Sequence, residues 1–388
     1  MSEVTLDWAS GAGAQIEVFS PSANAGTDYR VKYTPPFRST IRPPLQPLQL
    51  GPGELDPLNT ALDQVVQTAE GARGPAGAAA PPDGAVESQL MLSGNMLFDL
   101  IVPPDVAVDL RKPGLFLEFG VDDELVQYPW ELMHDGDDYI ALKHYIGRYV
   151  NSTVRTTLPF NASGAIGAQK LKILLVCASN PVRNVGDPIP RLPAAEKEAE
   201  DLFNLFTGLP GVEVRLLKNN TPGMAASYSN VFQALKDGCH IFHYTGHAYF
   251  DENKDTSYKS SLVLWDKDMS TGHLSKFIGN KKAPVFCFVN GCESALSQAW
   301  GKSYNIFSLA QAFLSTGAYL LGSRWKLADR EAADFAVAFY TALLQDKKSI
   351  GEATLLARKK LRESGPSNSF SWASYVLYAD PRVCFKYT

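Results

Sequence analysis

The chain of 388 residues has few cysteines, and no two of them have the spacing of a zinc-binding or redox pair. We therefore expect neither a disulfide framework nor a Cys-rich zinc site, and we predict no metal and no other cofactor. Any cysteine chemistry would come from a single thiol. The five cysteines are Cys177, Cys239, Cys287, Cys292 and Cys384.

An excess of positive charge and long apolar runs are also missing. The 36 basic and 41 acidic residues give a formal net charge of −5, which argues against nucleic acid or an anionic membrane as a partner. No apolar run approaches the roughly 18 residues of a membrane helix, and the opening MSEVTLDWAS does not resemble a signal peptide. We therefore expect a cytoplasmic protein. Its 45% of hydrophobic residues can form a sizeable core.

The first part of the chain is predicted to be an α+β region spanning residues 1–165. The Gly/Ala/Pro tract Gly71–Ala85 cannot hold a regular element and is interpreted as a flexible loop. The segments QIEVF and YRVKY before it alternate like strands, and Glu54–Thr68 has a helical pattern. After it we predict a helix over Val86–Leu100, a strand at GLFLEFG and a turn at DGDD.

The pattern changes at about Leu171, and residues 166–388 are predicted to form a second domain. The apolar runs LKILLVCAS, HIFHYTGHA and PVFCFVNGC are typical of strands that are buried on both faces. Amphipathic helices alternate with them, as over 199–206. Repeated βα units predict a mostly parallel sheet with helices on both faces, and ligand-binding residues collect at the carboxyl ends of such strands.

Two of the predicted strands end in reactive side chains, His247 and Cys292. They are 45 positions apart, which leaves room for one helix and allows the two strands to be neighbours. A thiol needs a base to become a thiolate, and His247 could be that base. A helix that begins just after Cys292 would place backbone N–H groups near the sulfur, where they lower its pKa and bind an oxyanion.

The structural interpretation of these residues stays open at this point. A cysteine is usually a small core residue, which is how we interpret Cys177 and Cys287. On spacing alone, a catalytic and a structural role for Cys292 are equally well supported. The charged run ARKKLR near the end of the chain is interpreted as a solvated helix face.

Histidines gather in the segment CHIFHYTGH without the geometry of a metal site. In a strand, His240 and His243 point to opposite faces, and no helix period brings them together with Cys239 and His247. His243 shares a face with His247. It could be a second pocket residue, although a core histidine that donates to the backbone is favoured.

The segments HYTGHA, VNGCES and LLGSRWKLADREAADFAVAFY, preceded by YPWELMHDGDDYIALKHYIGRYV, resemble in order and spacing the CHAT proteases, which are caspase- and separase-like cysteine peptidases of clan CD. The resemblance covers roughly Val86–Thr388. It implies a caspase-like α/β fold and a cysteine endopeptidase with a His247/Cys292 dyad and a thioester intermediate. It also implies an oxyanion hole of backbone N–H groups near Ala248 and Cys292; caspases have glycine where this chain has Ala248.

The resemblance also suggests partners. Many members carry sensory modules, whereas this chain resembles a stand-alone effector whose first 85 or so residues complete the fold or receive a signal from another protein. We therefore expect a protein substrate and an activating or regulatory protein, with activity latent until then. Members occur in bacterial antiviral defence and cell death, and some cleave gasdermins. The alternative is an inactive caspase-like scaffold that binds a peptide or partner protein.

In caspase-like sheets, the strand after the cysteine strand walls the pocket for the residue before the cut. This resemblance makes Ser323, Arg324 and Trp325 pocket candidates, with Asp329 near the pocket's floor or rim. Alternation places Ser323 and Trp325 on one face and Arg324 on the other. We therefore expect a basic or neutral residue before the cut rather than aspartate. A role of Asp329 as a helix N-cap explains its position equally well.

Overall fold

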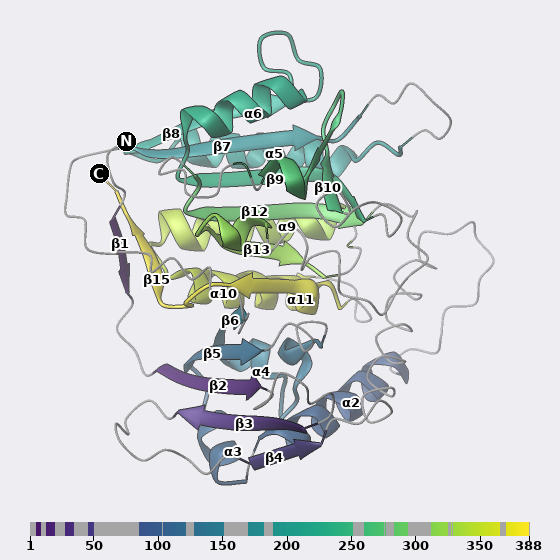
Figure 1. The fold of residues 1–388 in the computed structure, drawn as a ribbon, viewed down its shortest axis with the longest axis vertical. Helices are drawn as coiled ribbons and strands as arrows, with labels where there is room; N and C mark the ends of the chain where they lie inside the picture. Colours follow the sequence, from purple (N-terminus) through teal and green to yellow (C-terminus); the bar gives the residue numbers. More distant parts are fainter. Residues whose placement is uncertain are drawn as a thin grey trace.

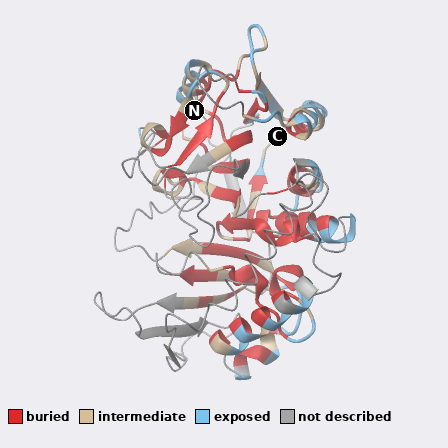
Figure 2. Cartoon of the chain, turned by 90° about the vertical axis from the view of Figure 1, so that its right-hand side faces the viewer, coloured by how far each residue is buried: buried red, intermediate tan, exposed pale blue. Residues whose placement is uncertain are grey.

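The computed structural model describes residues 5–8, 13–19, 28–34, 46–49, 85–102, 104–121, 128–150, 170–181, 189–250, 260–274, 276, 283–293, 312–324, 327, 329–364 and 370–387. Two β-sheets lie edge to edge, and the edge strand β14 of one contacts the edge strand β6 of the other (Figure 1). Buried residues lie in both sheets and in the helices against them (Figure 2). A short ribbon of β1 (Thr5–Trp8) and β15 (Val383–Lys386) pairs the two ends of the chain.

The first sheet has five strands and contains the two alternating segments near the start of the sequence. Strands β2, β5 and β6 run parallel to each other, and β3 and β4 continue the sheet as antiparallel strands. The strands predicted at QIEVF, YRVKY and GLFLEFG are confirmed, whereas β4 lies in a proline-rich stretch that the sequence pattern left without an element. Their order is β4 (Gln46–Gln49), β3 (Asp28–Thr34), β2 (Gly13–Phe19), β5 (Phe116–Val121) and β6 (Tyr145–Val150).

Helices α2 (Ala85–Ile101) and α3 (Pro104–Leu110) accompany this sheet. The helix predicted over Val86–Leu100 is confirmed, with Ala85 as its first residue rather than the last residue of a loop. The helix predicted over Glu54–Thr68 and the rest of the loop lie outside the described residues.

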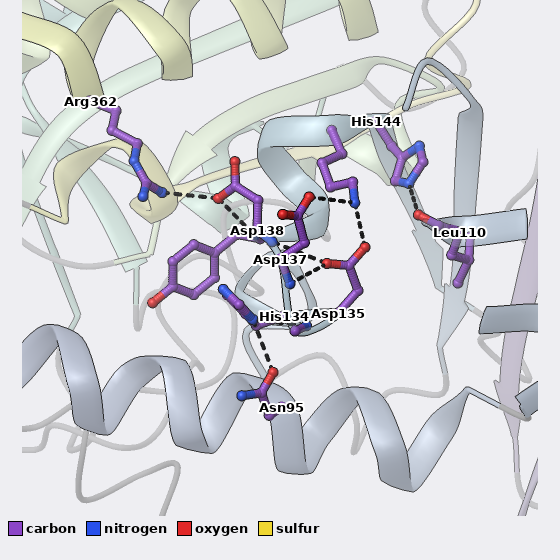
Figure 3. Close-up of polar contacts among 11 residues, drawn as sticks. Asn95, Leu110, His134, Asp135, Asp137, Asp138, His144 and Arg362 are labelled. Atoms are coloured by element: carbon purple, nitrogen blue, oxygen red, sulfur yellow. Dashed lines mark hydrogen bonds and ion pairs between the residues drawn. The ribbon is translucent and has the colours of Figure 1, made fainter. Parts of the chain in front are cut away.

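The predicted DGDD turn is present and ties the first region to helix α10 (Ile350–Ser364) (Figure 3). Asp135 accepts hydrogen bonds from the backbone N–H groups of Asp137 (3.0 Å) and Asp138 (3.1 Å), as acidic residues do in such turns. Lys143 forms an ion pair of 2.5 Å with Asp135, and Arg362 of α10 approaches Asp138 to 3.3 Å. The turn lies between η2 (Trp130–Leu132) and α4 (Ile140–Lys143).

The second sheet has eight strands and confirms the predicted, mostly parallel architecture. Strands β7, β8, β9, β12 and β13 are parallel, and β14 closes the sheet in the antiparallel direction. A hairpin of β10 (Ser260–Val263) and β11 (Asp268–Ser270) pairs with the last residues of β9. The main strands follow the order β8 (Val212–Lys218), β7 (Leu171–Ala178), β9 (Ile241–Phe250), β12 (Phe286–Glu293), β13 (Tyr319–Ser323) and β14 (Tyr375–Tyr378).

Helices cover both faces of the second sheet. The chain passes from β7 to β8 through α5 (Pro193–Thr207) and returns from β8 across β7 to β9 through α6 (Tyr228–Asp237). Right-handed crossovers in opposite directions place these two helices on opposite faces. Helix α9 (Asp329–Tyr340) packs beside α5, followed by a π-helical turn (Thr341–Gln345) and α10. The short helices α7 (Thr271–Leu274) and α11 (Ser371–Ser374) complete the described elements.

The structure bears on the predicted solvated helix face and on the expected absence of a membrane helix. Arg358 in the ARKKLR run is buried, so the interpretation of that run as a wholly solvated face is wrong at this residue. None of the helices that the structure describes combines the length and apolar character that a bilayer span requires.

Candidate active site

His247 and Cys292 are Cα partners in the parallel pairing of β9 and β12. The pair lies towards the carboxyl ends of both strands, the edge where ligand-binding residues collect in such sheets. The two residues are therefore brought together at the level of the backbone. The side chain of Cys292 lies outside the described part of the chain.

Steric crowding explains why the GHA and NGC segments have glycine at positions 246 and 291. A Cβ on Gly246 would lie 2.6 Å from the Tyr244 hydroxyl and 2.8 Å from the Ala178 carbonyl oxygen. A Cβ on Gly291 would lie 2.9 Å from the Cβ of Ala248. Since Gly246 and Gly291 also pair with each other, the two strands are closely packed immediately before His247 and Cys292.

The imidazole of His247 is buried and oriented by a backbone carbonyl. Its Nε2 lies 2.6 Å from the carbonyl oxygen of Pro190. A carbonyl can only accept, so Nε2 carries the proton and Nδ1 is the basic nitrogen. From the opposite side of the strand, the Tyr244 hydroxyl donates to the carbonyl of His247 at 2.6 Å and fixes its backbone.

The segment that carries Pro190 is itself anchored to α5. The backbone N–H of Leu192 donates to the carbonyl of Ser179 at 2.9 Å. The guanidinium of Arg191 donates two hydrogen bonds to Glu196, of 3.0 and 2.7 Å, and the Ser179 hydroxyl donates a third of 2.8 Å. These bonds, that of Arg191 above all, lower the pKa of Glu196. Sequence patterns did not single out this anchor.

A buried polar network lies beside the strand ends, and its centre is the carboxylate of Glu198 on α5. Glu198 accepts hydrogen bonds of 2.9 Å from the Thr245 hydroxyl on β9 and from the Asn290 amide on β12. Nε2 of His243 lies at the same distance from Glu198. His243 is thus a core histidine, as favoured, but its partner here is a carboxylate rather than the backbone.

The network extends to two further elements. Asn290 also donates to the carbonyl of Ala332 on α9 and accepts from the Tyr375 hydroxyl on β14, both at 2.9 Å. Nδ1 of His243 lies 3.2 Å from the Tyr340 hydroxyl at the end of α9. The network therefore joins two helices and three strands around the proposed dyad.

The expected oxyanion hole and substrate pocket are only partly described. Ala248 is paired with Glu293 of β12 and with Leu262 of β10. The helix expected to begin after Cys292 lies outside the described residues.

The structure describes the side chains of two of the four pocket candidates, Ser323 and Arg324. The Ser323 hydroxyl donates to the Gly291 carbonyl at 3.2 Å, beside the cysteine strand. Arg324 bonds through its backbone N–H to Ser374 at 2.7 Å, and its guanidinium interacts with the charges of Arg148 and Glu131. Trp325 and the side chain of Asp329, the first residue of α9, are not among the described groups.

Cys177, Cys239, Cys287 and His240 have structural positions. Burial raises the pKa of the Cys177 and Cys239 thiols to about 12, and that of Cys287 further, so all three stay protonated and inert. The core assignment of Cys177 and Cys287 is confirmed. Nδ1 of His240 accepts from the Lys172 backbone, and the described residues include no group of three or more His, Cys, Asp or Glu that could hold a metal ion.

A mostly parallel sheet flanked in this way is the fold of the caspase-like cysteine proteases. The chain belongs to the CHAT domain family, whose model matches residues 92–380, and this confirms the resemblance expected from the motifs. A search of curated proteins gives no match.

Solved structures with the same fold include the separase–securin complex of Saccharomyces cerevisiae. One crystal structure of it has a TM-score of 0.55 at 12% identity and covers 97% of this chain and 30% of that chain. A second crystal structure has a TM-score of 0.54 at 12% identity, and the match covers 94% of this chain and 30% of that chain. The Arg-specific cysteine proteinase gingipain R has a TM-score of 0.45 at 12% identity, with 79% and 70% covered. The chain thus spans about a third of the separase chain that it matches.

Proposed function

We propose that the protein is a cysteine endopeptidase that uses a dyad of His247 and Cys292. The observation that carries the proposal is the register pairing of these residues at the carboxyl ends of adjacent parallel strands in a CHAT fold. The hydrogen bond from His247 to the Pro190 carbonyl supports it, because it leaves Nδ1 as the nitrogen that can accept a thiol proton.

The proposed reaction has an acylation and a deacylation step. His247 takes the proton of the Cys292 thiol, and the thiolate attacks the carbonyl carbon of the peptide bond. Backbone N–H groups of Ala248 and Cys292 stabilise the oxyanion of the tetrahedral intermediate. Protonated His247 then gives its proton to the leaving amine, which leaves a thioester on Cys292. Water hydrolyses the thioester with His247 as the base and restores the free thiol.

The pocket before the cut is proposed to accept a basic or neutral residue. Arg324 supports this, because its guanidinium lies in the field of Glu131, a carboxylate of the protein itself, although the charge of Arg148 opposes that attraction. Matched fluorogenic peptides with Arg, Leu or Asp before the cut test this. A clear preference for Asp, lost in Arg324→Ala, would contradict it.

The biological setting proposed is a latent cytoplasmic protease, activated by a partner protein, that acts in antiviral defence or cell death on a gasdermin-type target. A cytoplasmic endopeptidase with an unregulated dyad would damage its own cell, which is the reason to expect latency. Slow cleavage of casein by the isolated protein, accelerated by a partner from the same operon, is the expected result. Fast cleavage without any partner would contradict latency.

The decisive experiment compares wild type with Cys292→Ala and His247→Ala in two assays. Iodoacetamide labelling located by mass spectrometry should mark Cys292 in wild type and fall strongly in His247→Ala. Cleavage of co-expressed or operon proteins should disappear in both variants. Cleavage retained in pure Cys292→Ala would contradict the proposed dyad. A folded protein that binds a peptide but shows no cleavage and no His247-dependent labelling would instead be the inactive scaffold.

A further inference from the structure

We propose that Glu198 is a positioning residue, which sets the strand of His247 against the strand of Cys292. This inference rests on the dyad proposed above. Glu198 acts through Thr245 and Asn290 and is not itself placed on the reacting atoms.

The carboxylate spans the two strands one step before the dyad. Thr245 and Asn290 are register partners, and the next partners with the same parity are His247 and Cys292. One oxygen of Glu198 accepts from Thr245 on β9, and the other accepts from Asn290 on β12. Two residues along a strand correspond to about 6.6 Å, so the clamp fixes both strands directly below the dyad.

Burial makes the clamp stiff. Glu198 is only 1% exposed, and a buried carboxylate that loses its hydrogen bonds suffers a large desolvation penalty. Thr245 and Asn290 are 1% and 3% exposed, so water cannot easily replace them as donors. Hydrogen bonds in such buried surroundings are stronger than in water. Glu198 therefore adds a side-chain link to the backbone pairing of the two strands, close to the dyad.

Helix α5 is also linked to the other contact of His247, through the ion pair of Glu196 with Arg191, which is 61% exposed. Glu196, two residues before Glu198, holds Arg191 in the segment whose Pro190 carbonyl orients the imidazole. The same helix therefore contacts the strand of His247 and the segment that orients its ring. A shift of α5 would move the imidazole relative to Cys292, and displacements of about 1 Å can cost roughly a hundredfold in rate.

The test compares Thr245→Val with Thr354→Val. Both remove one fully buried threonine hydroxyl, but that of Thr354 donates to the Ile350 carbonyl at 2.7 Å within α10, away from the dyad. Thr245→Val should lower kcat about tenfold or more with KM within about twofold, and slow the iodoacetamide labelling of Cys292. Thr354→Val should leave all three quantities unchanged at the same folded fraction.

Glu198 itself gives a second comparison by conservative rescue. In Glu198→Gln, the amide oxygen can accept from Asn290 and the amide nitrogen can donate to the Thr245 hydroxyl, so the clamp survives. We expect kcat within about threefold of wild type for Glu198→Gln, and a loss of about tenfold or more for Glu198→Ala. If Glu198→Ala does not fold, the two threonine variants still decide the question.

The outcomes separate this proposal from the one on which it rests. If wild type shows cleavage and labelling that depend on His247 and Cys292, but Thr245→Val matches Thr354→Val in kcat and labelling, positioning by Glu198 is wrong and the dyad stands. If labelling of Cys292 does not depend on His247, the dyad fails first, and the positioning role fails with it.

Discussion

Two buried carboxylates of this protein lie in opposite electrostatic surroundings. Glu198, below the proposed dyad, accepts from the neutral side chains of Thr245 and Asn290 and contacts His243. Glu131, in the Pro-Trp-Glu-Leu segment where the two sheets meet, is surrounded by arginines. We call Glu131 with its cations the arginine cluster; the cations are Arg148 of β6, Arg324 after β13 and Arg358 of α10.

Among the described residues, the arginine cluster brings three guanidiniums around one carboxylate. Arg148 donates through Nε to Glu131 at 2.8 Å and through Nη2 to the other oxygen. Arg358 donates to the Tyr375 carbonyl at 2.7 Å, but its Nε and Nη1 are buried without a hydrogen-bond partner among the described residues. Burial lowers the pKa of both Arg324 and Arg358 to about 10.

A buried charge can fix the positions of neighbouring elements or contribute little to stability, depending on its partners. The Glu198 network matches one acceptor group with several donors and fixes strand positions. The arginine cluster joins the first sheet to the second through buried charges, and buried ion pairs contribute little net stability. We therefore expect stability at the join between the two sheets to depend on the balance of its charges, whereas the Glu198 network depends on hydrogen bonds to neutral donors.

The largest effect is expected when the arginine cluster loses its carboxylate. Glu131→Gln should reduce the free energy of unfolding by about 3–5 kcal/mol, because it leaves the buried guanidiniums without a counter-charge. Urea unfolding measures this. Glu363→Gln, on an exposed residue of α10, is the control and should change stability by less than about 0.5 kcal/mol. A loss below 1 kcal/mol in Glu131→Gln would mean that the arginines find other partners.

The contribution of Glu131 to stability should also depend on pH. Burial alone raises the pKa of Glu131, but the charges of Arg148, Arg358 and Arg324 bring it below the ordinary value of 4.5. Its contribution to stability is therefore fully present above about pH 4.5 and is lost as the pH falls through the folded-state pKa.

The measurement is the free energy of unfolding between pH 6 and pH 3 in wild type and in Glu131→Gln. Wild type should lose more stability on acidification, by up to about 1.4 kcal/mol for each pH unit in the steep part. Parallel curves for the two proteins would show that the pKa of Glu131 is the same in the folded and unfolded states, which would contradict the lowering by the arginines.

The fold and the backbone of the candidate site could largely be predicted from sequence. Apolar runs and helical periodicity identify the strands, and the strand-end rule then selects His247 and Cys292, which the register pairs. The contact from Pro190 could not be predicted, because it is a backbone carbonyl in an irregular segment without a sequence signature.

The buried charges were missed for a different reason. Glu198 lies in a helix rich in charged residues, and Arg358 in the run ARKKLR, so both resemble solvated positions. Glu198 is four residues before the buried Leu202, and Arg358 is three before the buried Leu361. Helical spacing thus placed both on apolar stripes, which is the signal that could have identified them.

A smaller effect is expected at Tyr375, which lies between the two groups of charges. Its carbonyl accepts from Arg358, and its hydroxyl donates to Asn290 in the Glu198 network. Tyr375→Phe removes only the second contact and should lower the free energy of unfolding by about 0.5–1.5 kcal/mol. It should leave the difference between wild type and Glu131→Gln in acid unchanged. A changed difference would show that the two groups are coupled through this residue.

The smallest change is expected when the arginine cluster loses a cation rather than its anion. Arg358→Met keeps the length of the side chain and removes a buried guanidinium that has two unpartnered nitrogens, so stability should stay within about 1 kcal/mol of wild type or rise. Arg148→Met is the matched comparison; it removes the direct partner of Glu131 and should be strongly destabilising. Thermal unfolding of the two variants separates these expectations. Equal and large losses would mean that Arg358 is as necessary to Glu131 as Arg148 is, and that the positive charge of the cluster is not in excess.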